Sequence, residues 1–344
     1  METAGDMSTA PANLLDALPG IRVPVEDVPS MLTHMWDSDV GEHGAQRINS
    51  FRASQMNLVL HFGLATTADE ANRLFDTAIE FAQRYPCRLV VLCPGEGKRG
   101  DEEVLHGKVF SQCYVGKNLR DMCCCEALVL GYNTEDARFL EDQMSLWLET
   151  DLPVYHWFHR VPPERITDCY GSIVKRVTRA IYDSGVDPEL ASGFWTENAR
   201  VRDLAYARTL PMRQHIGQFL SVYPPESMSD ALQAVEVRHD PALRGEAVSL
   251  LDWMRGAVLR CLPAKEEDGS AAAPEFRLLR NKAEDGTMRV DWRYATEEKY
   301  FHWEYSVRSR TGQLRGCFGG LAAEQPLHID TLPRAAALAE ALFF

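Results

Sequence analysis

The stretch that decides the fold runs from residue 55 to residue 92 and reads QMNLVLHFGLATTADEANRLFDTAIEFAQRYPCRLVVL. Residues 57–62 form a short apolar run typical of a strand. The segment Thr67-Ala68-Asp69-Glu70 is a capping box, in which the Thr hydroxyl and the Glu carboxylate satisfy backbone N–H groups where a helix begins. Residues 87–92 are almost continuously apolar, as expected of a strand buried on both faces. Strand, helix and strand in this order predict a βαβ unit.

The same alternation of strands and helices continues to about residue 185. Further strands are expected at residues 104–114, 127–132, 152–158 and 180–182. A helix that Asn133 or Thr134 caps separates the second of these from the third. Residues 46–190 are therefore predicted to form an α/β domain with a mostly parallel sheet. Residues 1–45 are rich in Pro, Gly, Asp and Ser, and we expect an N-terminal arm with a short helix near residues 14–18.

The second half of the chain has a different pattern. A helical stretch is expected at residues 198–222, broken near Pro211 because proline cannot donate a backbone N–H. We expect a strand at residues 231–239. Two further helices are expected, at residues 246–262 and 332–344.

Residues 288–294 and 301–307 alternate strictly between apolar and polar side chains, which is typical of antiparallel strands with one packed face. Glu284-Asp285-Gly286 and Thr311-Gly312 are expected to supply the turns. Residues 191–344 are thus predicted to form a helical segment plus an α+β domain with an antiparallel sheet.

Composition limits the kinds of partner. The chain has 344 residues, of which 36 are Lys or Arg and 50 are Asp or Glu, so its formal charge is −14. A field of that sign repels phosphate backbones and anionic lipids, which disfavours a nucleic-acid or membrane partner. The first residues lack the basic start and apolar core of a signal peptide, and no apolar run approaches the ~20 residues of a membrane span. We therefore predict a cytoplasmic protein with mostly reduced thiols.

No motif specifies a catalytic, cofactor or metal site. The Gly-rich loop at residues 94–100 lacks the spacing of a P-loop, and Asp101-Glu102-Glu103 directly after it would repel a phosphate. His156 and His159 lie three apart on an expected strand, so they point to opposite faces and do not share a metal ion. No nucleophile-elbow pattern is present. The sequence thus predicts no cofactor, no metal and no catalytic set.

Two groups of residues remain as candidates for other roles. Cys123, Cys124 and Cys125 lack the CxxC spacing of a zinc site and are common core residues, but Lys117 and Arg120 nearby can lower a thiol pKa, which makes a redox role possible. Arg208 and Arg213 flank Pro211 in a kinked helical segment. These two arginines either pair with carboxylates across a domain or subunit contact, or lie on a solvated helix face with internal salt bridges.

Several segments together resemble one family, the glucose-6-phosphate dehydrogenase assembly protein OpcA. The matching segments, in the family's order, are residues 55–60, 86–92, 122–130, 151–157 and 203–208, followed by Pro211 and Arg213. The most distinctive is Asp203-Leu204-Ala205-Tyr206-Ala207-Arg208. The chain departs from the family pattern at Tyr206 and Met212, where the family favours tryptophan, and at Leu210, where it favours threonine.

The resemblance implies a non-catalytic, two-domain protein that binds glucose-6-phosphate dehydrogenase, an enzyme of the oxidative pentose phosphate pathway, and promotes its assembly or activity. Trp157, Arg160, Arg208 and Arg213 are the candidate partner contacts, with core packing as the alternative for Trp157. Thiol control is a property of some family members, but the resemblance assigns it to no cysteine here. A second hypothesis is an enzyme that binds a nucleotide or sugar phosphate in the loops after Leu92, Tyr132 and Phe158, at the carboxyl ends of the strands.

Overall fold

The computed structural model describes residues 14–38, 54–95, 106–115, 122–135, 137–188, 200–262, 273–282 and 285–344. The chain forms two compact units. Unit 1 comprises Met1–Tyr182, Ser192–Arg202 and Leu342–Phe344, and unit 2 comprises Asp183–Ala191 and Asp203–Ala341. The boundary predicted between residues 190 and 191 falls outside the described residues.

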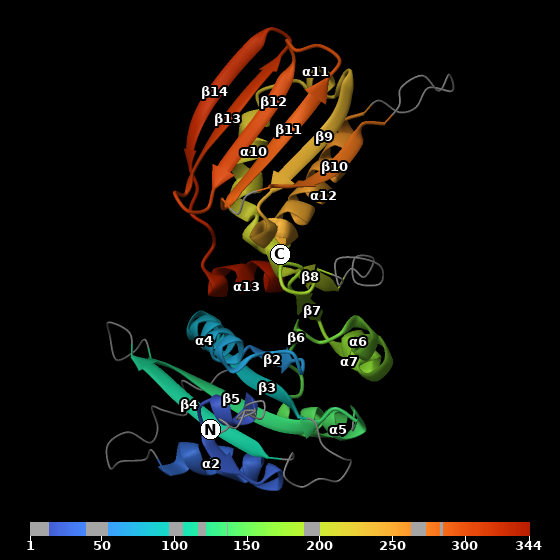
Figure 1. Cartoon of the computed structure of the whole chain (residues 1–344). Helices are drawn as coiled ribbons and strands as arrows, with labels where there is room; N and C mark the ends of the chain where they lie inside the picture. The colour runs from blue at the N-terminus through green and yellow to red at the C-terminus, as the bar shows by residue number, and fades with distance from the viewer. Residues whose placement is uncertain are drawn as a thin grey trace, which may run out of the picture. The chain divides into compact units, whose positions relative to one another are not determined.

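Unit 1 is built on an eight-stranded sheet in the order β1-β4-β5-β3-β2-β6-β7-β8 (Figure 1). Its strands are β1 (Ile21–Val23), β2 (Met56–Phe62), β3 (Cys87–Gly95), β4 (Gly107–Val115), β5 (Met122–Asn133), β6 (Val154–His159), β7 (Arg179–Tyr182) and β8 (Val201–Asp203). Its helices are α1 (Leu14–Ala17), η1 (Val25–Asp27), α2 (Val28–Ser38), α4 (Ala68–Arg84), α5 (Ala137–Trp147), α6 (Pro163–Cys169) and α7 (Gly171–Arg176).

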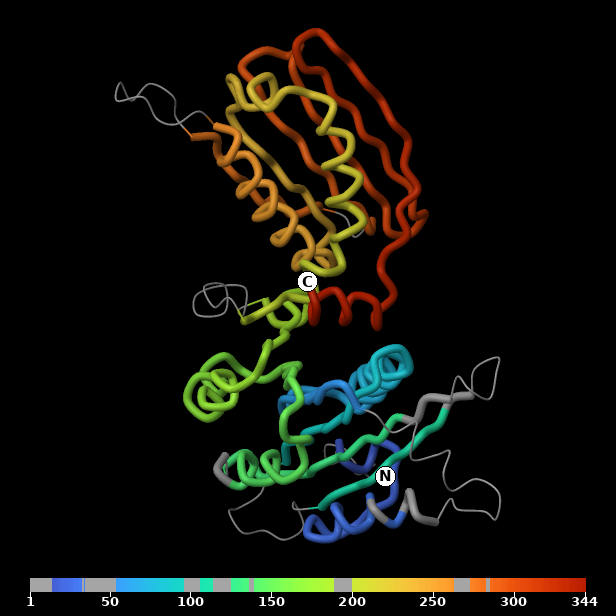
Figure 2. The backbone as a smooth tube through the Cα atoms, turned by 180° about the vertical axis from the view of Figure 1, so that it is seen from behind, coloured from blue at the N-terminus to red at the C-terminus, as the bar shows by residue number. Residues whose placement is uncertain are grey.

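The sheet is mostly parallel, as predicted. β5, β3, β2, β6 and β7 run parallel to one another, while β4 is antiparallel to β5 and to β1. Helices α4 and α2 lie on opposite sides of the sheet in both views (Figures 1 and 2). The order β5-β3-β2-β6-β7-β8 means that the chain builds outward from β2 in one direction and then returns to add β6 on the other side. β2 and β6 therefore flank a topological switch point.

Local signals explain the first βαβ unit. The capping box forms as expected, since Glu70 N–H donates to the Thr67 hydroxyl and the Thr67 N–H donates to the Glu70 carboxylate. Every residue of β2 is buried, which fits a central parallel strand. The described part of the N-terminal arm joins this sheet: α1 lies where a short helix was expected, and β1 pairs with β4.

Unit 2 has a six-stranded sheet in the order β10-β9-β11-β12-β13-β14. Its strands are β9 (Leu232–His239), β10 (Glu275–Arg280), β11 (Thr287–Tyr294), β12 (Tyr300–Ser306), β13 (Thr311–Phe318) and β14 (Leu321–His328). Its helices are α9 (Leu204–Arg208), α10 (Leu210–Leu220), α11 (Pro225–Ser229), η5 (Pro241–Leu243) and α12 (Arg244–Cys261). The last helix, α13 (Arg334–Phe343), begins in this unit.

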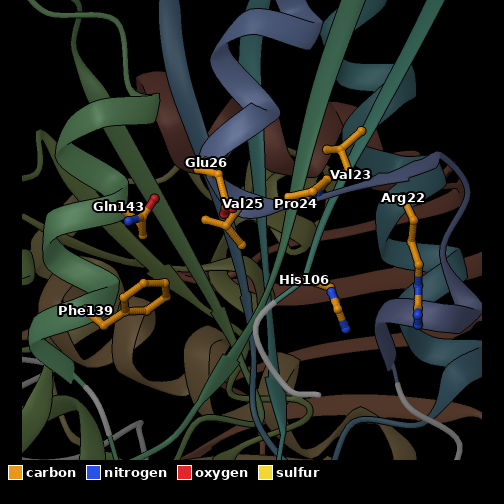
Figure 3. Close-up of a pocket in the computed structure, with 8 residues that line it drawn as sticks. All are labelled: Arg22, Val23, Pro24, Val25, Glu26, His106, Phe139 and Gln143. Carbon is orange, nitrogen blue, oxygen red and sulfur yellow. The ribbon is translucent and has the colours of Figure 1, made fainter. Parts of the chain in front are cut away.

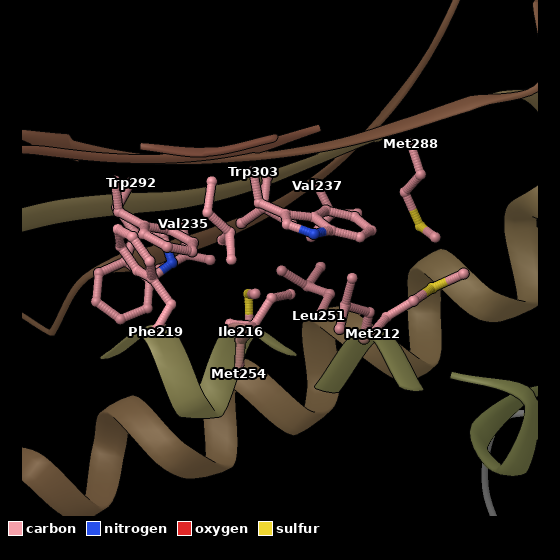
Figure 4. Close-up of a cluster of buried hydrophobic side chains, with 14 of the residues drawn as sticks. Met212, Ile216, Phe219, Val235, Val237, Leu251, Met254, Met288, Trp292 and Trp303 are labelled. Atoms are coloured by element: carbon pink, nitrogen blue, oxygen red, sulfur yellow. The ribbon is translucent and has the colours of Figure 1, made fainter. Parts of the chain in front are cut away.

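The sheet of unit 2 is antiparallel from β9 through β14, as predicted, and β10 adds one parallel pair at the edge. One face carries the alternating apolar residues, which pack on α10 and α12. Figure 4 shows Trp292 and Trp303 from the strands meeting Ile216 and Met254 from the helices. The alternation in the sequence therefore identified the core face correctly.

Two local predictions in this half were wrong, and one hairpin was not predicted. Residues 201–203 form strand β8 and not a helix. Thr311-Gly312 begins β13, and the turn lies just before it, where Arg310 adopts a φ of 57°. The hairpin between β13 and β14 was missed, although its turn residues Gly319 and Gly320 both adopt the positive φ that such turns require.

Gly63 makes the junction of β2 and β6 possible. Its N–H donates to the His159 carbonyl at 2.8 Å, and a Cβ atom here would lie 1.7 Å from the Arg160 carbonyl oxygen. We expect Gly63→Ala to lower the free energy of unfolding by about 3 kcal/mol, because backbone atoms and not a flexible side chain occupy the space. Urea unfolding monitored by circular dichroism measures this loss.

Gly171→Ala is the matched control in the same unit. Its added Cβ would meet only the Ile166 carbonyl oxygen, at 3.9 Å, which is an ordinary contact. We expect a change of about 0.5 kcal/mol or less. Equal losses in the two variants would contradict the role assigned to Gly63.

Candidate functional site

The segment Asp203-Leu204-Ala205-Tyr206-Ala207-Arg208 begins helix α9. Asp203 is its N-cap, and its carboxylate accepts hydrogen bonds from the Ala205 N–H and from the N–H and hydroxyl of Ser184. Burial raises the pKa of Asp203, against the effect of these donors. Asp203 therefore connects the start of α9 to Ser184, in the loop that follows β7.

Arg208, at the other end of α9, is also engaged within unit 2. Its NH1 and NH2 groups donate to the two Asp183 oxygens, each at 2.7 Å, and its Nε donates to Glu246 at 2.6 Å. Burial lowers the pKa of Arg208, but the ion pairs with Asp183 and Glu246 outweigh this effect and raise it. All three guanidinium nitrogens are thus committed to internal carboxylates, which is the pairing expected of a structural arginine.

Arg213 has a different setting. Its guanidinium lies over the Tyr206 ring, 3.7 Å from the centroid, and its NH1 donates to the Tyr206 hydroxyl at 2.7 Å. Tyr206 is 40% exposed. The two side chains form a stacked cation–aromatic pair that reaches solvent, and pairs of this kind are enriched at protein interfaces. We call these two residues the Tyr206–Arg213 pair.

The structure places Trp157 and Arg160 at β6 of unit 1. Trp157 is 3% exposed, in agreement with the core-packing alternative. Arg160 follows the last residue of the strand with a φ of 55° and forms a bidentate ion pair with Glu70, with distances of 2.7–3.2 Å. These two candidates belong to unit 1, whereas Arg208 and Arg213 belong to unit 2.

The cysteine candidates lie on β5. Cys125 is a buried thiol, whereas the side chains of Cys123 and Cys124 and the residues Lys117 and Arg120 lie outside the described part of the chain. Cys113 on β4 is disulfide-bonded, and the register places it opposite Cys124. The remaining described cysteines are thiols outside any disulfide: Cys87, Cys93, Cys169, Cys261 and Cys317.

The strand ends of unit 1 hold a cavity beside the loops after Leu92, Tyr132 and Phe158, where the second hypothesis expected a ligand. It has a volume of about 160 Å³ and lies beside the loops after β2, β5 and β6. Pro94, near the end of β3, also lines it, while residues 96–100 of the Gly-rich loop fall outside the described residues. The helix start that would attract a phosphate here, that of α4, is already occupied by the Glu70 carboxylate.

The sequence feature that could have indicated a polar site in this region is a pair of histidines inside apolar runs, His61 on β2 and His156 on β6. Both are fully buried, and His61 Nδ1 lies 3.0 Å from His156 Nε2. Burial lowers the pKa of His61 to about 3 and lowers that of His156 as well, so both rings are neutral. His156 and His159 do point apart as predicted, since His159 is 4.0 Å from Glu70 on the other face.

A second hollow of unit 1, about 680 Å³ in volume, is open to solvent and is lined by both apolar and polar side chains (Figure 3). Phe139 and Gln143 of α5 line one side, and Arg22 and His106 line the other. Arg22 is paired with Asp16, so its charge is already compensated. Its polar groups do not converge on one point, as those of a specific ligand site do.

The comparison with family models supports the family resemblance. Residues 78–194 match the model described as "Glucose-6-phosphate dehydrogenase subunit N-terminal domain", named OpcA_G6PD_assem. This part of the chain is similar to the N-terminal domain of the OpcA family. The match covers β3 through β7 and about a third of the chain, and it confirms the family resemblance.

The other comparisons add little to this OpcA-family assignment. No curated protein matches the chain. A solved structure of YvaA from Bacillus subtilis, described as an oxidoreductase, is similar at 9% identity and a TM-score of 0.36. It covers 83% of this chain and 87% of its own, and at that TM-score the likeness carries no inference.

Two further features of the described residues concern membrane-spanning helices and metal sites. No described helix is both long enough and apolar enough to cross a membrane. Within the same residues, no group of three or more His, Cys, Asp or Glu side chains is placed to hold a metal ion.

The Glu70–Arg160 pair gives unit 1 a specific response to acid. Arg160 lowers the pKa of Glu70 to about 2. A carboxyl with a lower pKa in the folded state stabilises the fold above its unfolded pKa, near 4.5, and loses that effect as the pH falls toward 2. We expect Glu70→Gln to destabilise the protein at pH 6, with a difference from wild type that shrinks steadily toward pH 2.5.

Urea unfolding at several pH values measures this difference. Glu80→Gln, which removes an exposed carboxylate from the same helix, is the control and should show a small, nearly constant difference. A deficit in Glu70→Gln that stays constant across the pH range would contradict the assignment.

Proposed function

We propose that the protein is a non-catalytic assembly or allosteric activating subunit of glucose-6-phosphate dehydrogenase, acting in the cytoplasm. The observation that carries the proposal is the family match over residues 78–194. The acidic charge of the chain supports a protein partner over a nucleic acid. To activate the enzyme, the subunit must bind its active state more tightly than its inactive state, because equal binding shifts no equilibrium.

The Tyr206–Arg213 pair is our preferred contact for the enzyme. Arg208 and Trp157 are internal, and Arg160 is neutralised by Glu70. Arg213 has an aromatic neighbour that holds its guanidinium in place, so little side-chain entropy would be lost on binding. Arg208 then supports the proposed interface indirectly, because its ion pairs hold α9, the helix that carries Tyr206.

Co-purification with the host's glucose-6-phosphate dehydrogenase tests the association, and the enzyme's activity with and without this protein tests the activation. We expect a stable complex and a change in the enzyme's activity or oligomeric state. Absence of a complex and of any effect, under both oxidising and reducing conditions, would refute the proposal.

Tyr206→Ala and Arg213→Gln test the contact. We expect each to weaken binding of the enzyme about tenfold, as removal of an interface anchor does. Arg255→Gln is the matched control, because Arg255 also lies over an aromatic ring in unit 2, 5.2 Å from the centroid of Phe276. Equal affinities of all three variants and the wild type would exclude the Tyr206–Arg213 pair as a contact.

A redox role of residues Cys123, Cys124 and Cys125 is a separate part of the proposal. Replacement of all three by serine should abolish any oxidant sensitivity of the effect on the enzyme. Because Cys113 lies opposite Cys124 and is disulfide-bonded, Cys113→Ser should have a similar effect. Sensitivity that persists in both variants would contradict this role.

A further inference from the structure

The cavity at the strand ends of unit 1 lies where α/β sheets bind ligands. It sits at the carboxyl ends of β2 and β6, the strands on either side of the switch point. In open α/β sheets, ligands bind in the crevice outside the carboxyl ends of the strands at this point. Its polar walls are formed by Tyr132, Thr134, Arg160, Arg165 and Tyr170.

A chain of buried polar groups leads from the interior of the sheet to this cavity. His156 Nε2 lies 3.0 Å from His61 Nδ1, and His61 Nε2 lies 2.7 Å from the Tyr132 hydroxyl. The Tyr132 hydroxyl lies 3.1 Å from the Tyr170 hydroxyl. The two tyrosines line the cavity, so the chain ends at its wall.

The inner end of the chain fixes its direction. His156 Nδ1 is buried and has no hydrogen-bond partner among the described residues. A neutral imidazole has one N–H, and a buried N–H without an acceptor is rarer in proteins than an acceptor without a donor. The proton of His156 therefore lies on Nε2 and is donated to His61 Nδ1. His61 then donates from Nε2 to Tyr132, and Tyr132 donates to Tyr170.

In this order of donors, the Tyr170 hydroxyl accepts from Tyr132, and its own proton has no acceptor within this series of hydrogen bonds. Tyr170 is 1% exposed, so bulk water does not readily supply one. Burial raises the pKa values of both tyrosines, so both hydroxyls keep their protons and remain donors. The cavity wall thus presents an O–H group that needs an acceptor.

The charge of the cavity has the sign that suits an anion. Arg165 donates one hydrogen bond, from NH1 to the Thr134 carbonyl at 2.7 Å, and forms no ion pair with a described residue. Arg160 is neutralised by Glu70, and none of the described residues that line the cavity is acidic. Among the described residues that line the cavity, Arg165 is therefore the one cationic side chain without an ion pair.

We propose that this cavity binds a small oxyanion, either free phosphate or the phosphate group of a small monoester, with Tyr170 and Arg165 as its donors. The volume of about 160 Å³ suits a phosphate group and a few further atoms. A dinucleotide does not fit, because the Glu70 carboxylate holds the helix start that would receive a pyrophosphate. The site goes beyond the proposed assembly role and does not depend on it.

Isothermal titration calorimetry of the whole chain, at constant ionic strength and without the enzyme, tests the site with inorganic phosphate and with glycerol 3-phosphate. We expect saturable binding of at least one of the two. Tighter binding of glycerol 3-phosphate identifies a monoester as the ligand, and equal or tighter binding of phosphate identifies the free anion. No heat of binding with either probe would overturn the proposal.

Two variants assign the binding to this cavity. Arg165→Gln removes this cationic charge and should weaken binding about tenfold or more, and Tyr170→Phe removes the terminal donor and should weaken it about fivefold. Arg84→Gln, an exposed arginine at the end of α4, is the control and should bind as the wild type does. Because Tyr170→Phe keeps the ring in place, it remains informative if Arg165→Gln does not fold. Wild-type affinity in a folded Arg165→Gln or Tyr170→Phe variant would refute the assignment.

Discussion

The constraint on which unit 1 depends is the contact between two backbones at Gly63 and Arg160. β2 and β6 can end side by side because Gly63 has no Cβ to displace the Arg160 carbonyl. The same contact accompanies the left-handed backbone of Arg160, whose side chain pairs with Glu70 at the start of α4. This close approach therefore lies at the switch point, where Gly63 and Arg160 also line the strand-end cavity.

That arrangement separates unit 1 from dinucleotide-binding proteins that share its strand order. In those proteins, a Gly-rich turn leads into a helix whose free N–H groups hold a pyrophosphate. Here the capping box supplies its own carboxylate, and an arginine neutralises that carboxylate. Unit 1 therefore combines a mostly parallel sheet with a first helix start that its own side chains close. A fold of this kind can serve an assembly subunit, because fold alone does not determine function.

The sequence predicted the sheets better than the site, and for a physical reason. Periodicity reports burial, so the strands around His61 and the alternating strands around Trp292 were recognisable. The cavity depends on residues that are distant in sequence, such as Tyr132 and Tyr170, and no local pattern announces their contact. Strand β8 was misassigned because its three residues precede a true helix, and the N-cap Asp203 belongs to both.

The most distinctive segment of the family resemblance turned out to be a structural joint. Asp203 caps α9, and Arg208 joins two carboxylates that lie 25 and 38 residues away in the sequence. Breaking such a buried cluster leaves uncompensated charges, which destabilises the fold. The motif is therefore explained by the structure of unit 2, without a partner. A partner would instead recognise the exposed side chains that α9 carries. The joint fixes α9, and Tyr206 of that helix, with Arg213 stacked upon it, reaches solvent.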